Sequence, residues 1–311
     1  MNILEIRELS KEFGDFKAVD GINLTVKQGE IYGLLGPNGA GKSTIINMIC
    51  GLLSKSSGEI FILNKNAQKN SNDIKREIGI VPQEIAIYED LTALENVIFF
   101  GSIYGLKGKD LKEKAMKALE FVGLLDKKKQ FPSKFSGGMK RRLNIACALV
   151  HEPKLVIMDE PTVGIDPQSR NHILESIKKL NETGTTIIYT SHYMEEVEAI
   201  CTKIAIIDNG KVVAEGTKEE LKAQFKEFNK IILKVSNIEN VDISKLKEIH
   251  GVDKVDCMGN TIEISTNTSI DNLDKILMVI MNSEVSIKSI EKTSIDLETV
   301  FLNLTGKKLR D

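Results

Sequence analysis

The sequence lacks any run of 18 consecutive apolar residues, and its first ten positions carry three charged side chains before an apolar run begins. A transmembrane helix needs about 20 mainly apolar residues, and a signal peptide has its own apolar segment near the start. We therefore expect neither feature, and we expect the protein to be made and kept in the cytosol.

The sequence also has no excess of positive charge. Its 42 Lys and Arg residues are balanced by 44 Asp and Glu residues, so the formal net charge is −2. This balance argues against a nucleic-acid partner that is bound by neutralising phosphates. With 41% hydrophobic and 28% charged residues in 311 positions, the composition is globular and allows one full core and a second, smaller one. Disordered, collagen-like and coiled-coil proteins are excluded.

Cysteine is scarce. The four cysteines lie more than 50 residues apart and show no metal-ligand spacing; they are Cys50, Cys147, Cys201 and Cys257. Each is flanked by apolar or small residues, so we expect four reduced thiols in the core rather than redox or metal sites.

From Ile3 to about Gly216, short apolar runs alternate with amphipathic stretches, which is typical of an α/β domain. Three runs are predicted as buried parallel strands: residues 31–35, 155–158 and 185–190. Each precedes a polar or glycine-rich turn, where the active-site residues of such sheets gather. Between Glu84 and Val150 helical periodicity takes over, which predicts a helical insert.

After Gly216 the pattern changes to β-α-β-β-α-β, which fits a small α+β domain of the ferredoxin-like type. We predict strands at 229–236, 252–258, 261–265 and 285–290, with helices at 244–250 and 270–281. Near the end of the sequence, the spacing of four apolar residues predicts a helix with one apolar face, which we expect to pack against another part of the protein. These residues are Leu297, Val300, Phe301 and Leu304.

The strongest motif is a P-loop that directly follows the predicted strand 31–35 and directly precedes an apolar helical run. Its residues are Gly36, Pro37, Asn38, Gly39, Ala40, Gly41, Lys42, Ser43 and Thr44. Glycines let backbone N–H groups surround phosphates at a helix N-terminus. Lys42 is predicted to reach the β- and γ-phosphates, and the Ser43 hydroxyl is predicted to hold Mg²⁺.

Two acids follow the predicted strand 155–158. An Asp at the end of a buried strand beside a P-loop is the expected partner of Mg²⁺, which assigns Asp159. Glu160 can face the γ-phosphate and polarise water. Without the P-loop, a solvated turn would be the better interpretation of this pair.

Three further turns have a structural explanation when taken alone. Ser136, Gly137 and Gly138 begin a helix and leave N–H groups free for an anion, although a capped helix start is the better explanation of this motif by itself. Gln83 and His192 each follow a predicted strand, and a single His there is more often a satisfied turn residue.

Taken together and in order, these segments resemble the ATP-binding subunit of an ATP-binding cassette (ABC) transporter over residues 3–216. The resemblance rests on six motifs and one aromatic: Walker A at 36–44, the Q-loop Gln83, the signature Ser136-Gly137-Gly138, Walker B at 155–160, the D-loop Gly164-Ile165-Asp166, the switch His192, and Phe13 in the place of the aromatic that stacks on adenine. It divides the chain into a nucleotide-binding domain at 1–216, with a helical subdomain at about 84–150, and an accessory domain at 217–311.

The resemblance implies an ATPase that uses ATP and Mg²⁺. Glu160 would be the general base or water-orienting carboxylate, and His192 would contact the γ-phosphate. Ser43, Gln83 and Asp159 would hold Mg²⁺. Two subunits pair head to tail in that family, as a homodimer or with a second nucleotide-binding subunit, and each ATP lies between Walker A of one chain and the signature of the other. The D-loop residue Asp166 belongs to the same shared site.

Some details are similar to exporters of the ABC-2 type, including drug-resistance pumps. Phe135 and Met139 stand where the usual signature has Leu and Gln, and the segments 161–168 and 296–301 share the resemblance. The resemblance implies a separate integral membrane permease, a peripheral location on the inner face of the membrane, and no nucleic acid. We expect residues 85–94 to contact the permease, unless they simply cover the core.

Two alternatives remain. Soluble ABC proteins act in DNA repair or translation, but repair members carry a long coiled coil between Walker A and the signature, and no sustained heptad lies there. A binding module that closes on ATP without hydrolysis is disfavoured by the presence of Glu160 and His192. Neither the transported compound nor the role of residues 217–311 is predicted.

Overall fold

The computed structural model describes residues 1–223, 228–267, 270–283, 285–293 and 296–306. Its described residues divide into two compact units, Met1–Lys218 with residues 304–306, and Glu219–Asn303. Among the described residues, no helix combines the length and the apolar character that crossing a membrane requires.

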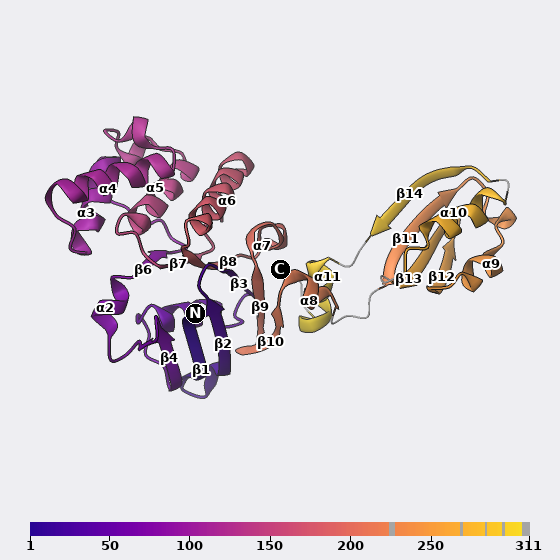
Figure 1. Cartoon of the computed structure of the whole chain (residues 1–311), viewed down its shortest axis with the longest axis horizontal. Coiled ribbons are helices and arrows are strands. Elements are labelled where there is room, and N and C mark those ends of the chain that lie inside the picture. The colour runs from indigo at the N-terminus through magenta and orange to yellow at the C-terminus, as the bar shows by residue number, and fades with distance from the viewer. Residues whose placement is uncertain (224–227, 268–269, 284, 294–295, 307–311) are drawn as a thin grey trace. The chain divides into compact units, whose positions relative to one another are not determined.

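A six-stranded sheet forms the centre of the first unit (Figure 1). In spatial order its strands are β10 (Lys211–Gly216), β9 (Lys203–Asp208), β3 (Ile31–Leu35), β8 (Thr186–Thr190), β7 (Leu155–Asp159) and β6 (Ile78–Val81). The neighbouring pairs from β9 to β6 are parallel, and only β10 is antiparallel. Every residue of β3 and β8 is buried, as expected of strands covered on both faces. The predicted α/β fold with a mixed sheet is confirmed.

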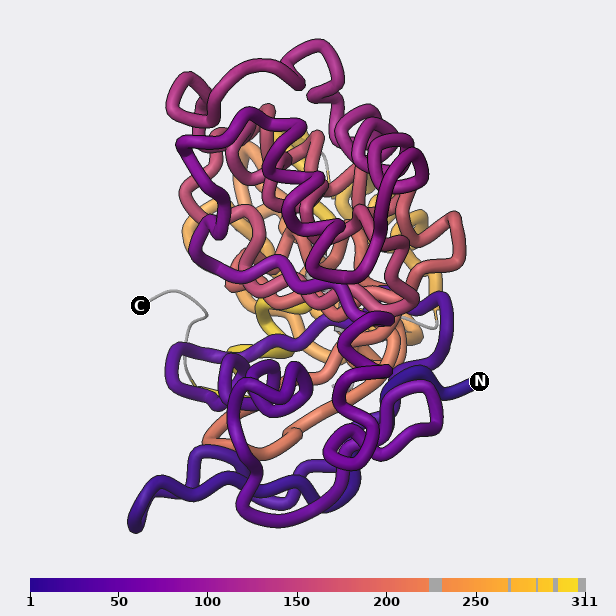
Figure 2. The backbone as a smooth tube through the Cα atoms, turned by 90° about the vertical axis from the view of Figure 1, so that its left-hand side faces the viewer, coloured from indigo at the N-terminus to yellow at the C-terminus, as the bar shows by residue number. Residues whose placement is uncertain are grey.

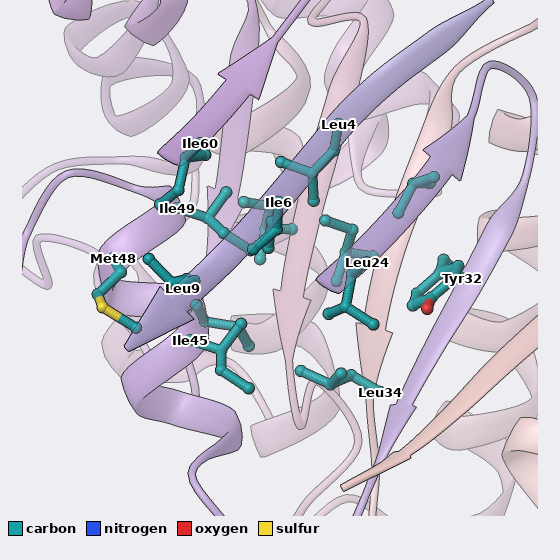
Figure 3. Close-up of a cluster of buried hydrophobic side chains, with 14 of the residues drawn as sticks. Leu4, Ile6, Leu9, Leu24, Tyr32, Leu34, Ile45, Met48, Ile49 and Ile60 are labelled. Atoms are coloured by element: carbon teal, nitrogen blue, oxygen red, sulfur yellow. The ribbon is translucent and has the colours of Figure 1, made fainter. Parts of the chain in front are cut away.

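A second, antiparallel sheet is formed by strands between residues 2 and 66, and it was not predicted from the sequence. Its strands are, in spatial order, β2 (Phe16–Lys27), β1 (Asn2–Phe13), β4 (Ser57–Ile62) and β5 (Lys65–Asn66). Apolar side chains of this sheet, of β3 and of helix α1 (Lys42–Ile49) point toward one another and form one core, in which Leu4, Leu24 and Ile45 are buried (Figure 3).

The predicted helical insert is present. It contains α3 (Ala93–Ile103), α4 (Gly108–Phe121), α5 (Gly137–Leu149) and two 3-10 turns, η1 (Leu125–Lys127) and η2 (Pro132–Lys134). Ala115 and Leu119 on α4, and Val122 directly after it, are buried. Figure 2 shows this insert at one end of the first unit and the antiparallel sheet at the other. The remaining helices are α2 (Ser71–Lys75), α6 (Pro167–Glu182) and α7 (Met194–Ile200).

The second unit contains the predicted β-α-β-β-α-β order. Its elements are β11 (Phe228–Val235), η3 (Ile238–Asn240), α9 (Ile243–Glu248), β12 (Val252–Met258), β13 (Thr261–Asn267), α10 (Leu273–Met281) and β14 (Ile287–Thr293). Helices α8 (Lys218–Ala223) and α11 (Leu297–Thr305) each contain residues of both units. The sheet order β12-β13-β11-β14, antiparallel throughout, is the ferredoxin-like arrangement. Ile231, Ile264 and Ile276 are buried in its core. On α11, Leu297, Val300 and Phe301 are buried, whereas Leu304 is half-buried.

All four cysteines are free thiols, but the prediction that all lie in the core is wrong for one. Cys50, Cys147 and Cys201 are buried, whereas Cys257 is exposed. Cys257 lies near the end of β12, an edge strand, where a side chain has a neighbouring strand on one side only. Burial raises the pKa of the Cys50 thiol to about 12, so this thiol stays protonated at neutral pH.

His151 gives the first unit a pH-dependent stability. Its ring stacks on Tyr104 with 3.5 Å between ring centroids, and its Nε2 lies 3.0 Å from the carbonyl oxygen of Ile78. Burial lowers the pKa of His151 from 6.5 to about 4. The unfolded chain therefore binds more protons between these two values, so stability is complete above the higher value and falls as the pH drops toward the lower one.

We predict that the free energy of unfolding falls by about 2 kcal/mol between about pH 7.5 and pH 5 because of this histidine alone. Urea unfolding of the wild type and of His151→Gln measures it, because Gln can still donate to Ile78 but does not titrate in this range. The wild type should lose more stability than the variant. Equal losses would show that His151 is not the group responsible.

Candidate active site

Predicted site residues from four segments meet at one edge of the central sheet. β3, β8, β7 and β6 are consecutive neighbours and parallel, so their carboxyl ends lie side by side. The P-loop follows β3, Thr190 ends β8, Asp159 ends β7, and Gln83 comes two residues after β6. The register pairs Asp159 with Thr190. Sheet topology therefore gathers residues that are more than 100 positions apart in the sequence.

A pocket of about 400 Å³ opens at this edge. It is lined by most of the P-loop and by groups from three other segments; the residues are Phe13, Phe16, Ala18, Asn38, Gly39, Ala40, Gly41, Lys42, Ser43, Thr44, Gln83 and Glu160. Ten of these were predicted. Phe16 and Ala18 were missed; the signal for Phe16 in the sequence was a second aromatic residue three positions after Phe13. Both rings are exposed, 49% for Phe13 and 64% for Phe16, which leaves apolar faces available to a planar base.

Lys42 is held in place before any ligand binds. Its side chain is buried, and Nζ donates to the carbonyl oxygens of Gly36 at 2.6 Å and Pro37 at 3.1 Å. An ammonium group has three donors, so one remains for a phosphate oxygen. Burial lowers the pKa of Lys42, while Glu160 and Asp159 act in the opposite direction.

Gly41 shows why this loop needs glycine. Its φ is +105°, and a Cβ there would lie 2.6 Å from the carbonyl oxygen of Ala18. A side chain would therefore force the loop away from β2 and misplace Lys42.

Glu160 is the meeting point of the predicted catalytic residues. Its Oε2 accepts a hydrogen bond from Nε2 of Gln83 at 3.2 Å and lies 3.2 Å from Nδ1 of His192. The Glu160 N–H donates to Oγ1 of Thr190 at 2.9 Å. Glu160 has φ +47°, a conformation unfavourable for a residue with a side chain. This strained backbone turns the carboxylate off the strand direction and toward the pocket.

The oxygens predicted to hold Mg²⁺ suit that ion. Ser43 and Gln83 line the pocket, and Oδ1 of Asp159 accepts a hydrogen bond from Oγ1 of Thr190 at 2.6 Å. A hydroxyl, an amide and a carboxylate are hard oxygen donors, which Mg²⁺ prefers. Among the described residues, no cluster of three His, Cys, Asp or Glu side chains could hold a metal by itself. This composition fits an ion that shares its ligands with nucleotide phosphates.

The signature residues do not join this pocket. Ser136 caps α5, with its Oγ accepting from the Met139 N–H at 3.3 Å, and neither Gly137 nor Gly138 lines the pocket. A Cβ on Gly138 would lie 2.3 Å from Oγ of Ser169, so the start of α5 packs closely on the start of α6.

Asp166, assigned to the same shared site, also lies outside the pocket lining and caps α6. Its carboxylate accepts from the Ser169 N–H at 2.9 Å. This hydrogen bond lowers the pKa of Asp166.

Two residues on α5 were missed. The buried guanidinium of Arg141 donates to the carbonyl oxygens of Pro82 and Gln83, and Oδ1 of Asn144 accepts from the Ala86 N–H at 3.0 Å. Helix α5, which begins at the signature residues and is called the signature helix below, thus holds the loop that carries Gln83 in place by hydrogen bonds. In the sequence, Arg141 lies in a Lys-Arg-Arg run that looks like an exposed basic surface.

Comparison with known proteins identifies the family. The model of the "ABC transporter" family matches residues 19–163. The linearmycin resistance ATP-binding protein LnrL of Bacillus subtilis (strain 168) is 46% identical over 313 residues, covering 99% of this chain and 100% of that protein. The chain belongs to the ABC transporter family, as an ATP-binding subunit.

Two further ABC proteins extend the comparison. The Nod factor export ATP-binding protein I of Cupriavidus metallidurans is 34% identical over 311 residues, covering 99% of each chain. A solved dimeric structure of the ATP-binding cassette MJ0796, in a post-hydrolysis state with ADP and Pi, is 29% identical with a TM-score of 0.62, covering 69% of this chain and 98% of that chain.

These relatives identify the chain as an ABC ATPase that binds and hydrolyses ATP to power export. ATP-binding subunits of this family work with membrane permease components and form dimers. The names of the relatives give no support to a role in DNA repair or translation.

We predict that Lys42→Met weakens nucleotide binding by tenfold or more, because Met fills the same space but offers no donor to phosphate. A binding titration with a fluorescent ATP analogue measures this. Lys55→Met is the matched control, since Lys55 also donates to a backbone carbonyl, that of Gly58, but lies outside the pocket. Unchanged affinity in Lys42→Met would refute the P-loop assignment.

Proposed function

We propose that this chain is the ATP-hydrolysing subunit of an exporter whose membrane-spanning part is a separate permease chain, and that it works as a pair on the inner face of the membrane. One observation carries the proposal: a P-loop pocket with a prearranged Gln83–Glu160–His192 group, and signature residues of the same chain that lie outside it. We assign the nucleotide site to residues 1–216 and an accessory role to residues 217–311.

Each residue has a role that its contacts support. Lys42 and the P-loop N–H groups would bind the phosphates, and the exposed ring of Phe13 would stack on the base. Glu160, with Gln83 and His192 at one oxygen, would orient water and accept its proton. Ser43, Gln83 and Asp159 would hold Mg²⁺, which neutralises charge on the phosphates when bound.

Pairing would complete the site. Ser136, Gly137 and Gly138 offer a hydroxyl and a helix N-terminus, but their chain's own pocket does not use them. Facing the pocket of a second chain, they would enclose the γ-phosphate. ATP would then favour the closed pair, and hydrolysis would release it. Either two copies of this chain or this chain with a related ABC subunit would satisfy this geometry.

We predict that Glu160→Gln keeps ATP affinity but lowers turnover by about 10²-fold or more, since the amide cannot accept a proton. Because the bound ATP is not hydrolysed, the variant should accumulate as a closed dimer. Size-exclusion chromatography with light scattering at low salt measures this dimer. A Glu160→Gln variant that stays monomeric with ATP would contradict the shared-site model.

We predict that Gly138→Ala, added to Glu160→Gln, prevents this dimer. The new methyl group would push α5 away from Ser169 and displace the signature. The pocket of the same chain does not include Gly138, so ATP affinity of the monomer serves as the internal control. Undiminished dimer formation would show that the signature does not contribute to pairing.

Residues 85–94 are our proposed permease contact. Asn96, fully buried, holds this segment: its Oδ1 accepts from the Tyr88 N–H at 2.8 Å, and its Nδ2 donates to the carbonyl oxygens of Tyr88 and Leu91. The Tyr88 ring packs edge-on against Phe99, yet 50% of Tyr88 is exposed. A rigid loop that presents an exposed aromatic is suited to contact a partner.

We predict that Tyr88→Asp reduces co-purification with the co-expressed permease subunit by about tenfold, with basal ATPase activity unchanged. Phe131→Asp is the control, because Phe131 is a second exposed aromatic of the helical insert. Equal effects of Tyr88→Asp and Phe131→Asp would rule out this permease contact.

Linearmycin is the first compound to test in a resistance assay of the co-expressed pair, given the name of the 46% identical relative.

A further inference from the structure

A buried carboxylate lies behind the switch histidine. Glu196, in the first turn of α7, is only 2% exposed. Its Oε2 accepts three hydroxyl hydrogen bonds, from Tyr189 at 2.8 Å, Ser191 at 2.6 Å and Thr162 at 2.8 Å. All three donors are themselves buried. A buried carboxylate is costly unless its acceptors are satisfied, so this group demands a defined arrangement of its donors.

The three donors come from the two segments that carry the proposed catalytic residues. Thr162 follows Glu160 by two positions, and Ser191 immediately precedes His192. One oxygen of Glu196 therefore ties the backbone after Glu160 to the backbone before His192. The side chains of these two residues meet at 3.2 Å on the pocket side.

His192 is also fixed from its other side. The Tyr193 N–H donates to Oγ of Ser191 at 2.9 Å, so the turn closes around His192 through the same hydroxyl that binds Glu196. The Tyr193 ring lies 4.5 Å from the His192 ring, and the guanidinium of Arg170 lies 4.2 Å over Tyr193.

Arg170 closes the network. Its Nε lies 3.4 Å from Oε1 of Glu196, and it projects from α6, which begins at the D-loop. In the described structure neither of these two atoms has a hydrogen bond, so charge attraction rather than a directed bond joins them. Glu196 thus connects three segments: the turn that carries His192, the turn after β7 that carries Glu160, and helix α6.

We infer that Glu196 is a positioning residue that holds His192 at Glu160 and makes this contact depend on α6. The inference rests on the proposed role of His192. A Gln at position 196 keeps the volume but has one accepting oxygen and no charge for Arg170. The hydroxyl donors and Arg170 must then rearrange, and His192 loses its fixed position.

A double-mutant cycle on the full chain tests this. Glu196→Gln should lower kcat for ATP hydrolysis by about tenfold or more, while ATP affinity in a binding titration changes by less than about twofold. In a His192→Ala background, Glu196→Gln should cause less than about a twofold further loss, because its effect passes through His192. Glu195→Gln, the same change at an exposed position of the same helical turn, should match the wild type.

The outcomes separate two failures. If His192→Ala does not lower kcat, the proposed role of His192 fails, and the inference with it. If His192→Ala lowers kcat but Glu196→Gln has no effect, or multiplies fully in the double mutant, only the inference is overturned. Should Glu196→Gln not fold, Ser191→Ala removes the hydroxyl that joins Glu196 to Tyr193 and enters the same cycle with the same expected non-additivity.

Discussion

Burial of charge is the constraint on which this site depends. Among the described residues, three charged side chains are buried: Lys42, Arg141 and Glu196. Lys42 is satisfied by carbonyl oxygens of the P-loop itself, and Arg141 by carbonyl oxygens of the loop that carries Gln83. Glu196 is satisfied by hydroxyls of the segments that carry Glu160 and His192. Because an unpaired buried charge costs several kcal/mol, these segments have little freedom to move independently. The hydrogen bonds to these three charges thus fix the P-loop, the signature helix α5 and helix α7, which carries Glu196.

These pairings connect functions that are separate in the sequence. Arg141 joins the signature helix to the backbone of Gln83, whose side chain contacts Glu160. In the first turn of the same helix, Gly138 packs on α6. A movement of the signature toward a second chain would therefore pull on the loop that contacts Glu160. Each step of this coupling between the signature residues and Glu160 is a direct hydrogen bond or a close packing contact.

Much of the fold and site could be predicted because their signals are local. The P-loop pattern, the buried strands 31–35 and 155–158, and the acids after the second strand are contiguous, and sheet topology then brings them together. Gln83 and His192 could be assigned only through the family resemblance, because single residues carry no pattern. The N-terminal sheet was missed because β1 mixes exposed and buried positions irregularly around bulges.

Arg141 and Glu196 could not be recognised from the sequence for a physical reason. Each lies next to residues of like charge in a helix, Lys140 and Arg142 in one case and Glu195 in the other. Such runs usually face solvent. Only the packing of α5 on the Gln83 loop, and of α7 on the Walker B turn, reveals that one member of each run points inward. A buried ionic group is weak evidence for stability. Arg141 contacts the backbone of Gln83, and Glu196 contacts the segments of Glu160 and His192, so both favour the arrangement in which Glu160 lies between Gln83 and His192.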